Sequence, residues 1–97
     1  SGEIIDATEA LRIGLVDVVH AAADLRERTL DFARAMAARS PVALRMAKSA
    51  VRAAAEMPLS AGLQYETELF VTCFASDDKR EGVAAFLEKR PASFTGR

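Results

Sequence analysis

Residues 81–94 read EGVAAFLEKRPASF and carry a pattern found in much of the chain, an apolar helical face with a sharp end. Val83, Phe86 and Leu87 recur at intervals of i, i+3 and i+4, so they share one face of a helix. The proline that follows cannot continue this helix, which is therefore expected over about 78–90. Lys89 and Arg90, at the end of this helix, either complement the negative end of the helix dipole or bind a negatively charged group.

Further helices are predicted toward the N-terminus from similar signals. Alanine, which has the highest helix propensity, supplies 20 of the 97 residues. Capping-box spacings at 6–9 and 24–27 predict two helix starts, and Gly14 suits a left-handed stop that keeps the first helix short. The pair at 40–41, serine then proline, predicts a restart, and Ser60 is expected to cap the next long helix.

These signals predict an all-α fold, a bundle of about five helices that forms a single domain over residues 1–97. The second and third helices are expected to end near Arg39 and Glu56, and a short extended piece is expected near 15–19 because that segment is branched and apolar. The residues predicted to face inward are Ala43, Ala47, Ala50, Val51 and Ala54 in one helix and Leu63, Phe70, Cys73 and Phe74 in the next.

Composition favours a globular protein with 51% hydrophobic and 28% charged residues. The net charge of −1 gives no general attraction to nucleic acid or to an anionic membrane. No apolar run approaches the roughly 20 residues of a membrane helix, and no secretory signal is visible. A single cysteine cannot form an intrachain disulfide, which fits the cytoplasm. We therefore predict a cytoplasmic protein without nucleic-acid or membrane partners.

No pattern of residue types and spacings in the sequence indicates catalysis or metal binding. One histidine and one cysteine do not make the convergent ligand set that a metal site needs, so no metal ligand and no cofactor are predicted. Cys73 shares its stripe with phenylalanines and is interpreted as a buried, inert thiol, and His20 as a surface or loop residue. Glu66 and Glu68 are two apart on a helix, point in different directions and are interpreted as solvated charges. No catalytic residue is assigned.

Three blocks, taken in chain order, resemble a known family: EIIDATEALRIGLVDVV (3–19), SPVALRMAKSAV (40–51) and GLQYETELFVTCFASDDKREGVAAFLEKRPASF (62–94). They resemble the C-terminal region of the crotonase superfamily, the enoyl-CoA hydratases and isomerases. The last block is the most specific, through Asp78, Glu81-Gly82, Phe86 and Glu88-Lys89-Arg90.

The resemblance implies that the chain is the C-terminal helical part of a larger enzyme, which hydrates trans-2-enoyl-CoA in fatty-acid β-oxidation. The catalytic ββα core, with its oxyanion hole and its acid–base glutamates, is then expected upstream of this sequence. The resemblance also implies that Phe86 and Lys89 reach the CoA bound to a neighbouring subunit. Lys89 would meet the 3′-phosphate or pyrophosphate and Phe86 the adenine or pantetheine end. Arg90 is interpreted as a structural residue that forms an ion pair or complements the helix dipole.

Two other interpretations stay open from the sequence. The chain could be a helical interaction module without a CoA role, or part of a crotonase relative with isomerase or hydrolase chemistry.

The resemblance also implies an oligomer, because members of the family form trimers or hexamers. In the family this helical part closes over the core and makes much of the contact between the subunits of the trimer. The exposed apolar faces of the chain alone predict self-association, with a dimer possible.

Overall fold

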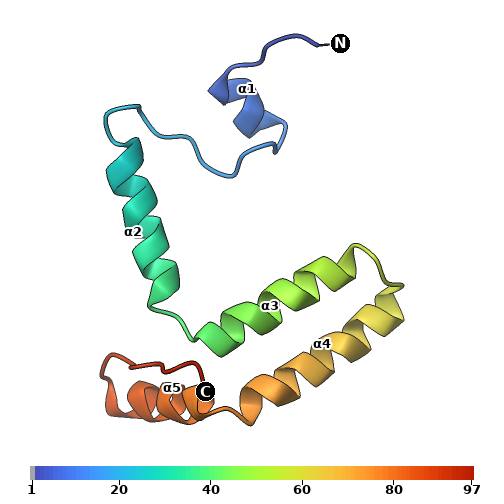
Figure 1. Cartoon of the computed structure of the whole chain (residues 1–97), viewed down its shortest axis with the longest axis vertical. Coiled ribbons are helices and arrows are strands. Elements are labelled where there is room, and N and C mark those ends of the chain that lie inside the picture. Colours follow the sequence, from blue (N-terminus) through green and yellow to red (C-terminus); the bar gives the residue numbers. More distant parts are fainter. Residues whose placement is uncertain (1) are drawn as a thin grey trace. The chain divides into compact units, whose positions relative to one another are not determined.

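The computed structural model describes residues 2–97 and contains five α-helices and no strand within that range (Figure 1). They are α1 (Ala7–Arg12), α2 (Leu25–Ala37), α3 (Pro41–Ala54), α4 (Leu59–Phe74) and α5 (Asp77–Glu88). The prediction of an all-α chain with about five helices is confirmed. By their internal contacts the residues form two compact units, one ending at Ala33 and the other spanning Arg34–Arg97. Each unit is described by itself.

In the first unit, short-range hydrogen bonds fix α1. The Asp6 carboxylate caps the helix by accepting the Glu9 N–H at 2.8 Å, and Gly14 follows the helix at φ 75°. The capping box also predicted that the Glu9 carboxylate reaches back to the cap residue. This part is wrong, because that carboxylate binds Arg12 at 2.6 and 2.7 Å. A short extended piece was predicted at 15–19; these residues are non-helical, with bends at 15 and 17, and they form no strand.

In the second unit, serine side chains cap two of the three helix starts, and the sequence predicted one of them, Ser40. Ser40 Oγ accepts the Ala43 N–H at 3.2 Å and caps α3, with Pro41 in its first turn. Ser76 caps α5 in the same way. The prediction that Ser60 caps α4 is wrong, since α4 begins at Leu59 and Pro58 occupies the cap without a side-chain hydrogen bond.

The helices of the second unit pack through small faces and leave most large apolar side chains uncovered. α3 packs against α4, and α4 contacts α5. Only Val42, Ala85 and the carboxylate residue Asp78 are buried in this unit. Val51 was predicted to face inward but is 73% exposed, and Phe70 is 63% exposed. The predicted apolar faces therefore exist, but within this chain little covers them.

A search of residues 2–97 for a helix both long and apolar enough to cross a membrane finds none.

Candidate functional site

The two residues predicted to bind CoA lie at the C-terminal end of α5. Phe86 occupies the last turn and is 82% exposed. Lys89 follows three positions later, is exposed, and forms the C-cap of the helix. No ion pair within residues 2–97 involves the Lys89 ammonium. An exposed aromatic ring and an unpaired cation are thus one helical turn apart.

Lys89 adopts a left-handed backbone conformation, with φ 54° and ψ 39°. It is the only non-glycine residue with positive φ within residues 2–97. The turn is closed by the Lys89 N–H, which donates to the carbonyls of Ala85 and Phe86, and by the Arg90 N–H, which donates to Ala85 at 3.0 Å. Glycine is the usual residue at this position, and a residue with a side chain costs about 1–2 kcal/mol there. A lysine at this position therefore makes the fold less stable than a glycine would.

Arg90, next in the chain, is bound by two carboxylates. Its Nη1 and Nη2 donate to the two oxygens of Glu81 at 2.6 and 3.0 Å, and its Nε donates to Glu88 at 2.6 Å. The Ser93 N–H donates to Glu81 at 2.7 Å. The hydrogen bond from Arg90, followed by that from Ser93, lowers the pKa of Glu81 to about 2. The prediction that Arg90 is a structural ion-pair residue is confirmed.

Asp78, in the first turn of α5, connects α3, α5 and the C-terminal tail. Its carboxylate is 2% exposed and accepts hydrogen bonds from the Ser40 hydroxyl at 2.6 Å and from the N–H groups of Thr95 and Gly96 at 2.8 and 3.0 Å. Burial by itself raises the pKa of Asp78, but the bonds from Ser40, Thr95, Gly96 and Val42 outweigh it, so the pKa lies below its ordinary value. The tail therefore runs back along α5 (Figure 1).

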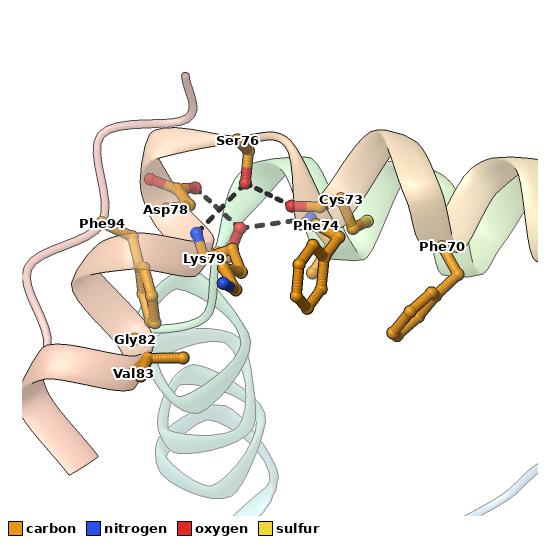
Figure 2. Close-up of a pocket in the computed structure, with 11 residues that line it drawn as sticks. Phe70, Cys73, Phe74, Ser76, Asp78, Lys79, Gly82, Val83 and Phe94 are labelled. Carbon is orange, nitrogen blue, oxygen red and sulfur yellow. Dashed lines mark hydrogen bonds between the residues drawn. The ribbon is translucent and has the colours of Figure 1, made fainter. Parts of the chain in front are cut away.

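A pocket of about 320 Å³ opens between α3, α4, α5 and the tail (Figure 2). Its lining is mainly apolar, with Phe70 and Phe74 from α4, Val83 from α5 and Phe94 from the tail. The Lys79 ammonium lies 3.8 Å from the centroid of the Phe74 ring, in cation–π geometry. An apolar site with one cation at its edge can accept apolar side chains, but the lining offers no arrangement for catalysis.

Gly82 lets the tail approach α5 closely at this pocket. A β-carbon at Gly82 would lie 3.4 Å from Cε1 and 3.7 Å from Cζ of the Phe94 ring, at the close limit of van der Waals contact. The lack of a side chain at Gly82 therefore leaves room for the Phe94 ring close to the helix (Figure 2).

The other residues considered from the sequence lie apart from Phe86 and Lys89. His20 is exposed in a non-helical segment of the first unit, and Glu66 and Glu68 are exposed on α4, as predicted. Cys73 is half-buried against the pocket rather than buried. In the part of the chain that the structure describes, no group of three histidine, cysteine or acidic side chains is placed to hold a metal ion.

The structural roles of Asp78 and Glu81 were not predicted from the sequence. Asp78 was placed only at the start of the last predicted helix, and no partner of Arg90 was named. Glu81 and Arg90 are nine positions apart, and Ser40 and Asp78 are 38 apart. Neither spacing is a local signal. The available hint was that both acidic residues fall in the most specific sequence block.

Comparison with known proteins adds independent observations. The family model described as enoyl-CoA hydratase/isomerase matches residues 1–97. The chain is 44% identical to 2,3-dehydroadipyl-CoA hydratase of Escherichia coli and 47% identical to a probable enoyl-CoA hydratase of Mycobacterium bovis, over 97 residues in each case. These matches cover all of this chain but only 38% of each relative. The chain thus spans about two-fifths of the length of those relatives.

Solved structures agree with these matches. An enoyl-CoA hydratase from Geobacillus kaustophilus superposes with a TM-score of 0.92 at 44% identity, covering 99% of this chain and 36% of that one. A structure described as a putative enoyl-CoA hydratase/isomerase from Mycobacterium abscessus superposes with a TM-score of 0.93 at 36% identity, covering 100% of this chain and 40% of that one. The helical arrangement described above therefore recurs inside larger chains.

Proposed function

The chain belongs to the enoyl-CoA hydratase/isomerase family, and we propose that it is the C-terminal helical domain of an enzyme that adds water to a trans-2-enoyl-CoA. The observation that carries this proposal is the match over the whole chain to relatives named as hydratases. The relatives are more than twice as long as the chain, so the remaining part of such an enzyme has room for the catalytic core.

The helical domain contributes binding and assembly in this proposal, not the chemical step. Hydration of an enoyl thioester needs hydrogen-bond donors for the developing oxyanion and a carboxylate pair to deliver water. Within residues 2–97 the two glutamates considered for this role, Glu66 and Glu68, are exposed on α4. The catalytic groups are accordingly assigned to the core, outside this chain.

Lys89 and Phe86 are proposed to bind the CoA of a neighbouring subunit. The Lys89 ammonium is exposed and has no ion-pair partner within the described residues, so it is available for the 3′-phosphate or pyrophosphate. A charge-assisted hydrogen bond of this kind contributes about 1.5–3 kcal/mol. The exposed Phe86 ring offers an apolar surface for the adenine or pantetheine end.

The same proposal explains the uncovered apolar faces. Phe70, Phe74, Val83 and Phe86 are each at least 46% exposed in this chain. Exposed apolar patches of this kind mark interaction surfaces in soluble proteins. We assign these faces to contacts with the catalytic core and with neighbouring subunits, where the helical domain closes over the substrate.

The experiment that tests this function is an assay of the complete protein encoded with this chain. Purified protein is mixed with trans-2-enoyl-CoA thioesters of short and medium chain length, and loss of the conjugated thioester absorbance is followed. We expect 3-hydroxyacyl-CoA as the product. Migration of the double bond without addition of water would assign the protein to an isomerase instead, and a complete lack of turnover would support the non-catalytic interaction module.

A further inference from the structure

The structure assigns Glu81 and Arg90 as positioning residues for Lys89, an inference that rests on the proposed contact between Lys89 and CoA. Neither side chain needs to touch the ligand. Together they hold the backbone turn in which Lys89 sits and neutralise negative charge beside it. The class of ligand remains the phosphate groups of an acyl-CoA.

Side-chain contacts anchor the chain on both sides of Lys89. Arg90 binds Glu88, the residue before the lysine, at 2.6 Å and Glu81 at 2.6 and 3.0 Å. The Ser93 N–H binds the same Glu81 carboxylate at 2.7 Å. One carboxylate on α5 thus holds the residue directly after Lys89 and a second residue three further on.

A lysine at φ 54° persists only where surrounding contacts favour the left-handed conformation over the alternatives. The hydrogen bonds from Lys89 and Arg90 to Ala85 close the turn, and the Glu81–Arg90 ion pair fixes the residue that follows it. Without this ion pair, fewer contacts hold Lys89 in the left-handed region, and its ammonium samples more positions.

The charge around Lys89 also depends on Arg90. Glu88 directly precedes the lysine, and its carboxylate and the negative end of the α5 dipole both repel a phosphate. Arg90 binds Glu88 at 2.6 Å, which leaves the Lys89 charge available to an anion. Loss of Arg90 exposes the Glu88 carboxylate beside the proposed phosphate contact.

A second anchor makes the inference testable without loss of the fold. Asp78 holds Thr95 and Gly96 by hydrogen bonds of 2.8 and 3.0 Å, and its own N–H donates to the Arg97 carbonyl at 3.0 Å. These contacts do not involve Glu81. Substitution of Glu81 is therefore expected to loosen residues 88–93 while the end of the tail stays bound to α5.

The experiment measures coenzyme A affinity by calorimetry and KM for an enoyl-CoA, in the complete protein. Glu81→Ala releases both Arg90 and Ser93, and Glu81→Gln keeps the side-chain volume while removing the charge. We expect Glu81→Ala to weaken coenzyme A binding and raise KM by about threefold, with kcat changed by less than about twofold. Glu81→Gln should give a smaller change in the same direction.

A double-mutant cycle separates positioning of Lys89 from an independent effect. If Glu81 acts through Lys89, Glu81→Ala should add no further loss of affinity in a Lys89→Ala background. Asp77→Asn is the matched control, because it breaks an exposed ion pair of 2.6 Å between Asp77 and Arg80 at the other end of α5. This control should leave KM unchanged.

The outcomes distinguish the inference from the function on which it rests. If Lys89→Ala leaves affinity unchanged, the proposed CoA contact fails. If Lys89→Ala weakens binding but neither Glu81 variant does, only the positioning role is overturned. An equal loss from Glu81→Ala with and without Lys89 would also overturn it. If Glu81→Ala shows reduced helicity, Glu81→Gln takes its place in the comparison, and the same criteria apply to it.

Discussion

The Ser40 hydroxyl donates a 2.6 Å hydrogen bond to the buried Asp78 carboxylate, which lies 38 positions later in the chain. The same Ser40 oxygen accepts the Ala43 N–H and so caps α3, while Asp78 also accepts the N–H groups of Thr95 and Gly96. One pair of polar side chains therefore joins the start of α3, the start of α5 and the C-terminal tail.

Ser40→Ala should destabilise the complete protein, because it removes a helix cap and a donor to a buried carboxylate. Loss of the cap alone costs about 1 kcal/mol. Ser60→Ala is the matched control, since Ser60 lies in the first turn of α4 and provides no cap there. Thermal or urea unfolding would measure both, and equal stability of the two variants would contradict the role given to Ser40.

Acid should destabilise the second unit through Glu81 and Asp78. Both pKa values are lower in the folded chain than in ordinary carboxyls, about 2 for Glu81 against 4.5 and below 3.8 for Asp78. Groups of this kind stabilise the fold above their unfolded pKa, and the stabilisation is lost as pH falls through the folded pKa. Stability should therefore be steady near neutral pH and decline from about pH 4.5 toward 2.

Circular dichroism at graded pH measures this decline, with Asp78→Asn as the comparison. The variant should be less stable at neutral pH and should lose less of its remaining stability on acidification. A wild-type protein that becomes more stable between pH 4.5 and 2 would contradict the assignment.

The isolated 97-residue chain should have no hydratase activity. The groups that stabilise the oxyanion and deliver water are assigned to the core, and such groups supply most of the rate. A spectrophotometric assay with crotonyl-CoA checks this expectation. Turnover by a contaminant-free preparation of the isolated chain would show that catalytic groups lie within it.

The isolated chain should also self-associate. Leu63, Phe70 and Phe74 on α4 are each more than half exposed, and Phe86 on α5 is 82% exposed. Light scattering at roughly tens of micromolar should show dimers or larger species, because monomers rarely leave contiguous apolar patches in water. Phe70→Ser combined with Phe74→Ser should shift the chain toward monomer. A clean wild-type monomer would contradict the assignment of these faces to contacts.

Local signals in the sequence predicted the helices better than their contacts. The helix ends at Asp6, at Gly14 and at Ser40 with Pro41 are set by bonds within a few residues, and each lies where expected. The predicted cap at Ser60 was wrong because Pro58, at φ −56°, occupies the cap position and α4 begins at Leu59, one residue before Ser60. The prediction that Val51 faces inward was wrong, because helical periodicity shows which residues share a face but not whether another element covers that face.

The candidate site was predictable in part. The resemblance assigned Phe86 and Lys89, and the structure places both at the exposed end of α5. The left-handed conformation of Lys89 could not be predicted from the sequence, because the position carries no glycine, the usual signal for that turn. The partners of Asp78 and Glu81 come from distant residues or from the irregular tail, where no periodicity exists to read.

The most direct test of the account is the KM for an acyl-CoA of the complete Lys89→Ala protein, measured at low and at high salt. Loss of a charge-assisted phosphate bond should raise KM about tenfold at low ionic strength. The difference should shrink at high salt, where exposed charges are screened. The kcat should change little, because the phosphate is remote from the reacting carbon. Lys48→Ala, which removes an exposed lysine from α3, should leave KM unchanged. A wild-type KM for Lys89→Ala at low salt would contradict the account and reduce the cationic end of α5 to a helix terminus.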